Sequence, residues 1–242
     1  MKAPFAFWKS GAPVFNPATL TASVYLKDYA GAPWAGTASA GTSSTHSFAA
    51  GSAPAVGANF GSHPSADFDG AANNLQGTGD TLGAYFTGSA YGLDIIFEAD
   101  TAAAPTGAGT EYTDVALFGD VTNGEFYVTY TTAGVRVGLY DGVTYQNTVP
   151  ISHATATKGN AQIYYDGTSV YCRVNGSAFQ SVVVGNLRAA ALSGNVGVLG
   201  ATYLAGGKFD GRIARVMAFA YAPTLAQFNS LYANAQSSYS VP

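Results

Sequence analysis

Acidic residues are the first place to look for chemistry in this sequence of 242 residues, which has only three glutamates. A retaining glycosidase needs two carboxyl groups about 5–5.5 Å apart. Glu98 is followed by Asp100 but by no further acid, and Glu111 stands three residues before Asp114. A spacing of three places two side chains on opposite faces of a strand. The acids therefore do not predict a catalytic carboxylate pair.

The residues needed for nucleophilic or zinc chemistry are scattered. The three histidines, His46, His63 and His153, lie far apart, and no Gly-x-Ser-x-Gly motif is present. Cys172 is the one cysteine, and no two histidines stand at a spacing typical of zinc ligands. No Gly-Lys-Ser/Thr sequence marks a phosphate-binding loop. We therefore predict a protein that is not an enzyme and has no cofactor.

Calcium is the ion that the remaining acids favour most. It takes six to eight oxygen ligands, several of them carboxylates. No Lys or Arg occurs between Asp28 and Val135, and four aspartates of this region are candidate ligands: Asp94, Asp100, Asp114 and Asp120. Because no compact Asp-x-Asp-x-Asp/Asn loop is present, the prediction remains that no metal is bound.

The charge balance bears on partners and on the cellular compartment. Ten Lys and Arg stand against fourteen Asp and Glu, for a net charge of −4, so no basic face for nucleic acid is indicated. No apolar run approaches the roughly 20 residues of a membrane span. The apolar stretch within residues 1–13 is too short for a signal peptide. We predict no nucleic-acid partner, no membrane insertion and synthesis in a reducing cytoplasm.

Two groups of aromatic residues are candidates for binding. A sugar site would use an exposed aromatic ring with hydrogen-bonding groups beside it, and the candidates for such a site are Trp34, Tyr112, Tyr145 and Asn147. The alternative is that these rings fill or cap the core.

The second group lies in residues 1–20, which read as an extended arm. This arm carries Phe5, Phe7, Trp8 and Phe15 without the period of a strand or helix. Unburied aromatic groups of this kind usually mark an interface, so we expect the arm to dock on a neighbouring molecule. The alternative is that it packs on its own domain as an edge strand.

Short alternating runs indicate the elements that position these residues. They are rich in Val, Ile, Tyr, Phe and Thr, end at Gly, Asp or Asn, and cover Ala22–Lys27, Tyr91–Ala99, Tyr112–Gly119, Glu125–Thr131, Val135–Tyr140, Asn160–Tyr165 and Ser169–Val174. Turn signals at this spacing favour an antiparallel sandwich or barrel. Asp166-Gly167 and Asn175-Gly176 predict two tight hairpins. For residues 29–66 we expect a meandering surface segment anchored by Trp34 and Phe48.

One helix is predicted near the end of the chain. Apolar residues recur there at helical spacing, at Leu225, Phe228, Leu231, Tyr232 and Ala235. Thr224 and Gln227 fit a capping box. We expect Leu225, Phe228 and Leu231 to pack against the sandwich, and Cys172 to point into the core as a small apolar residue.

The order of elements from Asn160 onward carries a resemblance to a known family. NAQIYYDGTSVYCRVNG is followed by VGVLGATYLAGGKFDGRIARVMAFAYAPTLAQFNSLYANA, and PSADFDGAANNL comes earlier in the chain. This arrangement resembles the concanavalin A-like lectin/glucanase superfamily, in its laminin G-like jelly-roll branch. The resemblance implies an all-β, two-sheet antiparallel jelly-roll sandwich over residues 21–242, with the extended arm of residues 1–20 before it and one short C-terminal helix.

The resemblance also implies a choice of functions. Hydrolases of this superfamily carry Glu-x-Asp-x-x-Glu or Glu-x-Asp-x-Glu, whereas here Thr101 and Ala102 follow Asp100. The superfamily also includes lectins, adhesion modules and virion proteins of tailed bacteriophages, and the first 60 residues resemble leader segments of phage proteins. We predict a non-enzymatic virion structural protein, a head decoration, fibre or tail-associated protein on the virion surface, made in the host bacterial cytoplasm. Its partners would be copies of itself and capsid or tail proteins.

Two alternatives stay open at this point. The chain could be a carbohydrate-binding module or receptor-binding adhesin that recognises a cell-surface glycan. It could also be a glycosidase that uses Glu98 or Glu111 in an arrangement the spacing does not reveal.

Overall fold

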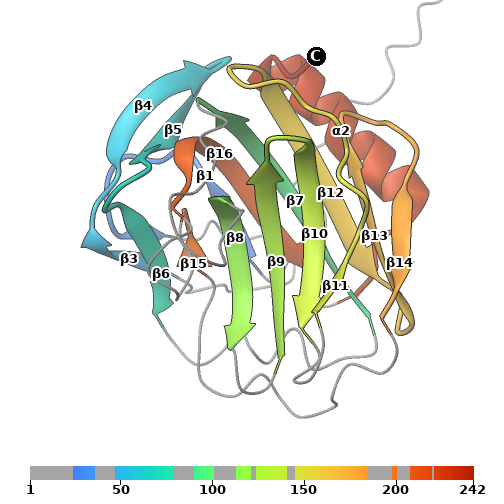
Figure 1. Cartoon of the computed structure of the whole chain (residues 1–242). Coiled ribbons are helices and arrows are strands. Elements are labelled where there is room, and N and C mark those ends of the chain that lie inside the picture. Colours follow the sequence, from blue (N-terminus) through green and yellow to red (C-terminus); the bar gives the residue numbers. More distant parts are fainter. Residues whose placement is uncertain are drawn as a thin grey trace, which may run out of the picture.

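The computed structural model describes residues 24–35, 47–78, 90–100, 113–120, 124–140, 145–184, 198–200, 208–219 and 221–242. Their strands form two antiparallel sheets that face each other, and the helix α2 (Leu225–Tyr239) lies on the outside of one of them (Figure 1). The predicted all-β jelly-roll sandwich with one C-terminal helix is confirmed. The predicted arm, residues 1–20, lies outside the described residues.

The first sheet carries α2 on its outer face. Its strands follow the order β14 (Gln180–Val183), β13 (Ser169–Val174), β12 (Lys158–Tyr165), β7 (Tyr91–Ala99), β16 (Asp210–Phe219), β5 (His63–Asp69) and β4 (Ala55–Phe60), with β1 (Val24–Lys27) also paired to β16. β5 pairs with the first half of β16 and β1 with the second half. The two strands therefore share one edge of β16.

The second sheet closes the other side of the core. Its order is β11 (Tyr145–Asn147), β10 (Gly134–Tyr140), β9 (Gly124–Thr131), β8 (Thr113–Asp120), β15 (Val198–Leu199), β6 (Asn74–Thr78), β3 (Ser47–Ser52) and β2 (Trp34–Ala35). Strands that follow each other in sequence often lie in different sheets, as β5 and β6 do. β11 and β14 are the edge strands of their sheets, and these two edges lie next to each other.

The alternating strands bury the residues that their pattern predicts. Tyr91, Leu93, Ile95 and Phe97 of β7 all belong to the core between the sheets. Cys172 is fully buried in the same core, and burial raises the pKa of its thiol. The opposite face of β7 is buried as well, because α2 covers the outside of this sheet. The strand is therefore covered on both faces, which the alternation alone does not show.

The two hairpin turns form where they are predicted. Asn175 and Gly176 have φ angles of 50° and 68°, as a primed turn requires, and they connect β13 with β14. Between β12 and β13, the Asp166 carboxylate accepts hydrogen bonds from the backbone N–H groups of Thr168 and Ser169.

The start of α2 is confirmed, but its apolar stripe is partly wrong. The Thr224 hydroxyl accepts from the Gln227 N–H, and the Gln227 side chain accepts from the Thr224 N–H, which completes the capping box. Phe228 and Leu231 are fully buried, whereas Leu225 is 59% exposed. With about 100° of rotation per residue, the buried face follows Phe228, Leu231, Ala235 and Tyr239, and Leu225 lies to one side of it.

The expectation of a meandering segment over residues 29–66 is wrong where the structure describes that range. β2, β3, β4 and the first residues of β5 lie in it. These strands contain many Gly, Ala and Ser residues, and their pairing rests on backbone hydrogen bonds that composition does not reveal. Trp34 is an anchor, as predicted, because it is buried and packs edge-to-face on Tyr29.

Candidate functional site

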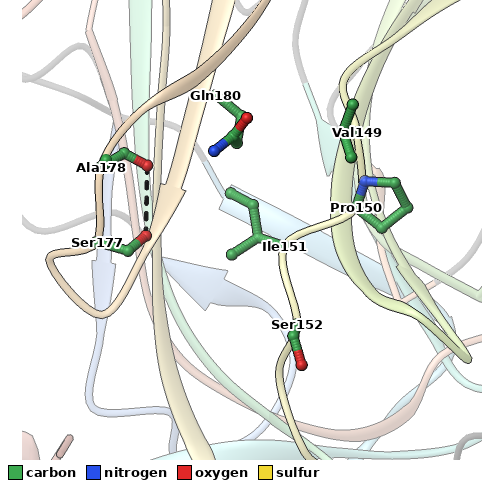
Figure 2. A pocket seen from close by; sticks show the side chains of 7 residues that line it. All are labelled: Val149, Pro150, Ile151, Ser152, Ser177, Ala178 and Gln180. Carbon is green, nitrogen blue, oxygen red and sulfur yellow. Dashed lines mark hydrogen bonds between the residues drawn. The ribbon is translucent and has the colours of Figure 1, made fainter.

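An open groove lies at the edge of the sandwich, between the segment that follows β11 and the segment that precedes β14 (Figure 2). Its volume is about 400 Å³, and its lining residues are Val149, Pro150, Ile151, Ser152, Ser177, Ala178 and Gln180. Figure 2 shows Ile151 between the two walls, with the side chain of Gln180 facing it. We call this feature the edge groove.

The first wall runs along β10 after β11 ends. The Thr148 N–H donates to the Val137 carbonyl at 2.9 Å, and Ile151 and Val135 exchange two backbone hydrogen bonds. Pro150 lies between these attachment points and has no N–H to donate. Val149 is 67% exposed. The backbone is thus fixed by β10 while an apolar side chain faces the solvent.

The second wall is held by the hairpin turn and by α2. The Ser177 N–H donates to the Val174 carbonyl at 3.1 Å. Phe179 packs against Phe228 of the helix, with ring centroids 5.8 Å apart, and the Arg173 guanidinium lies 4.8 Å from the centre of the Phe179 ring. These contacts keep Ala178 and Gln180 in place, so the groove is bounded on both sides by fastened backbone.

The lining of the edge groove determines what it can bind. None of the seven lining residues is charged or aromatic, and the polar side chains among them are Ser152, Ser177 and Gln180. Val183 on the adjoining edge strand β14 is 69% exposed. Such a surface can bind an uncharged, largely apolar group, and it offers no titratable side chain for acid–base catalysis.

Asp94, one of the candidate calcium ligands, has structural partners instead. Its carboxylate is fully buried under α2 and accepts from Arg215 Nη2 at 2.6 Å, Asn160 Nδ2 at 2.9 Å and Gln162 Nε2 at 3.0 Å. Burial lowers the pKa of Arg215, but Asp94 and the nearby Tyr239 outweigh burial, and the net shift is upward. Asp94 is therefore not suited to the calcium-ligand role for which it was a candidate, since its oxygens already hold structural partners.

The same network ties the helix to the sheet. Arg215 Nη1 donates to the Asn234 side chain at 2.6 Å, and Arg173 Nη2 donates to that of Asn229 at 2.8 Å. Gln162 Nε2 also donates to the Phe228 carbonyl at 2.8 Å. These polar contacts fix α2 and, through it, the second wall of the edge groove.

The other acids that the sequence singles out lie at the end of β7. Glu98 is buried in an ion pair with Arg212, and Asp100 lies 3.8 Å from the same guanidinium. Burial and the neighbouring Asp100 raise the pKa of Asp67, which Arg212 opposes. Among the described residues, no group of three or more His, Cys, Asp or Glu side chains could hold a metal ion. The side chains of Asp114 and Asp120, on β8, lie outside the described part, as does Glu111.

Of the four candidate sugar-binding residues, the structure describes the side chains of Trp34 and Asn147. Trp34 is 2% exposed, and its Nε1–H donates to the Lys27 carbonyl, so the prediction of an exposed platform at Trp34 is wrong. Asn147 is half-buried and accepts from the Tyr127 hydroxyl at 2.8 Å. β2 and β11 are the two edge strands of the second sheet, on opposite sides. Trp34 on β2 is therefore far from Asn147 on β11. Tyr112, the side chain of Tyr145, and the arm residues Phe5, Phe7, Trp8 and Phe15 lie outside the described residues.

The two described histidines make separate structural contacts. His63 Nδ1 lies 2.6 Å from the Asp28 carboxylate, and its ring stacks on Tyr239. His153 Nε2 lies 3.0 Å from the Thr157 carbonyl, and burial lowers the pKa of this imidazole. The third, His46, lies outside the described residues.

The sequence analysis missed the edge groove. Its walls come from residues 149–152 and 177–180. Nothing in the sequence indicates that these two segments lie next to each other. The one local signal is the uncharged run Thr148–Ile151 after a very short strand.

Comparison with solved structures identifies the fold. Domain 4 of AbnA, an extracellular arabinanase from Geobacillus stearothermophilus solved with arabinotriose, matches with a TM-score of 0.56 and 15% identity, over 76% of this chain and 81% of that domain. The binding domain of botulinum neurotoxin DC, solved with rat synaptotagmin II, matches with a TM-score of 0.65 and 9% identity, over 88% of this chain and 51% of that one. The binding domain of botulinum neurotoxin serotype D gives 0.63 and 9%, over 90% and 52%.

The fold is a two-sheet antiparallel jelly roll. This chain spans about half the length of the neurotoxin binding domains that it matches. No protein-family model matches the sequence, and no curated protein matches it. Among the described residues, no helix is both long and apolar enough to cross a membrane.

Proposed function

We propose that this chain is a non-enzymatic structural protein of a bacteriophage virion, and that its jelly roll acts as a binding module through the edge groove. One observation carries the binding role. The open surface of the edge groove is uncharged and largely apolar, whereas the described acids Asp94 and Glu98 are held in ion pairs under α2 and at the end of β7. The resemblance of the sequence to phage virion proteins supports the setting.

The lining favours a protein partner. The centres of protein interfaces are depleted of charged residues, as this groove is. A sugar instead presents many hydroxyl groups that need hydrogen-bond partners, and the lining supplies three polar side chains, of which Ser177 already bonds to the Ala178 carbonyl. Capsid or tail proteins and other copies of this chain are the partners that the setting provides.

A glycan is the second candidate ligand. The arabinanase domain was solved with arabinotriose, which favours sugar binding by this fold. A glycan array with the full chain tests it, and Ala178→Arg, which would fill the edge groove, should abolish any signal that depends on the groove. A glycan signal that this variant removes would replace the protein partner with a sugar.

Purified particles test the virion role. Particles released by lysis of the cells that encode the chain should contain it, as measured by mass spectrometry of density-gradient fractions. Ala178→Arg should be lost from the particles, whereas Ala71→Arg on the exposed β5–β6 turn should be retained. Absence of the wild-type chain from the particles would refute the virion role, and equal incorporation of both variants would refute the role of the groove.

A further inference from the structure

The edge groove exposes apolar side chains that lie directly over the main core. Val149 in its lining is 67% exposed, and it is one of the four large hydrophobic residues that stand out as exposed in the described part of the chain. Ile151, also in the lining, is partly buried and packs against the main core. An exposed apolar surface continuous with a core marks an interaction site.

The sequence contains a segment with matching chemistry. Residues 1–20 include Phe5, Phe7, Trp8 and Phe15, with Lys2 and Lys9 as their charged residues. Large aromatic side chains gain most from burial in an uncharged site. The groove, at about 400 Å³, falls within the ~300–1,000 Å³ of pockets that hold small organic groups.

We propose that the edge groove of one copy binds the aromatic N-terminal segment, residues 1–20, of a second copy. This inference names the partner of the groove and rests on the proposed function only in taking the groove as a contact surface. Every copy has both the segment and the groove, so the exchange can be reciprocal and closed.

Topology favours a second copy over the same chain, and the segment is long enough to reach either groove. Twenty-three residues precede Val24, and at about 3.3 Å per residue they span up to ~75 Å. β1 lies five strand spacings from β14, or about 24 Å. A path straight across the first sheet is closed to the segment, however, because the strands between β1 and β14 have core on their inner face and α2 on their outer face. Exchange with a neighbour needs no such path.

Cysteine cross-linking of full-length chains in solution tests the inference. Ala6→Cys places a thiol between Phe5 and Phe7, and Ser152→Cys places one on an exposed lining residue. The native Cys172 is fully buried, so it should not react with a short bis-maleimide. Mixing the two single variants should give a cross-linked dimer. Ala6→Cys mixed with Ala71→Cys, at the exposed β5–β6 turn, should not.

The controls separate docking from chance contact. Adding Ala178→Arg to the Ser152→Cys chain should lower the dimer yield about tenfold or more, because a charge in an apolar site opposes binding. No dimer above the Ala71→Cys control would overturn the inference. A chain that carries both Ala6→Cys and Ser152→Cys tests the alternative. A cross-link that forms only within such single chains would also overturn the inference, since the segment would then occupy its own groove. None of these outcomes depends on finding the chain in virions, so this inference and the proposed function fail separately.

Discussion

The pair of Asp94 and Arg215 shows how a residue suited to chemistry can serve the fold. Both side chains are fully buried, and each carboxylate oxygen of Asp94 has at least one hydrogen-bond donor. In the sequence, Asp94 is one of several acids in a region without Lys or Arg. Its partner lies 121 residues away, so the sequence gives no sign that the carboxylate is neutralised.

Removing Asp94 should destabilise the protein strongly. Asp94→Ala leaves Arg215 as a buried charge without its counter-ion, and breaking such a pair costs about 3–5 kcal/mol. Asp100→Ala is the matched control, because its side chain is 42% exposed and 3.8 Å from Arg212, a geometry worth below about 1 kcal/mol. Urea unfolding followed by circular dichroism measures both. Equal losses would mean that the buried network does not hold α2.

His153 should make stability depend on pH. Burial lowers its pKa from the usual 6.5, although the Thr157 carbonyl and Glu98 oppose this. The unfolded chain therefore binds more protons than the folded one in the window between the folded pKa and about 6.5, and stability falls as the pH drops through it.

The variant His153→Gln isolates this contribution. The wild-type chain should lose its advantage over the variant as the pH falls from about 7 to 5, because only the wild-type chain has a partly buried imidazole that takes up a proton more readily when unfolded. Unfolding midpoints at several pH values give the difference directly, and the other two histidines cancel in the comparison. Parallel pH curves for the two chains would show that His153 does not titrate differently on folding.

At the scale of elements, α2 is the best test of what periodicity can predict. Its start, its capping box and two of its three expected contacts follow from the sequence. The third, Leu225, fails because residues spaced by three drift around a helix of 3.6 residues per turn. That α2 covers β7 is not predictable locally, since β7 alternates like a strand with one exposed face.

Phe228→Ala should therefore cost far more than Leu225→Ala. Phe228 is fully buried against Tyr164 and Phe179, and truncating such a ring costs about 3–5 kcal/mol. At about 2–4 °C per kcal/mol for a chain of this size, the thermal midpoint should fall by at least about 6 °C. Leu225→Ala should shift it by about 1 °C or less, because that side chain is largely in solvent. Similar shifts for both variants would mean that α2 packs on another face.

At the scale of the molecule, the strands with Val, Ile, Tyr and Phe alternation were predictable, and the strands within residues 34–60 were not. β3 (SFAAGS) and β4 (AVGANF) have weak side-chain signals, and their partners set their conformation. The edge groove is harder still to predict from the sequence than these strands. It exists only because the ends of two sheets meet, so no single segment carries its signature.

Removal of residues 1–20 is the decisive change at this scale. A chain that begins at Thr21 keeps every described element, so we expect it to fold with a thermal midpoint close to that of the full chain. It should nevertheless lose the oligomer that the aromatic segment forms with the edge groove, because the groove then has no aromatic occupant to bury. Light scattering at matched concentrations measures the mass, and calorimetry measures the midpoint. Loss of folding on truncation would instead make residues 1–20 part of the core. A truncated chain that keeps the mass of the full-length oligomer would place the contact between copies on another surface.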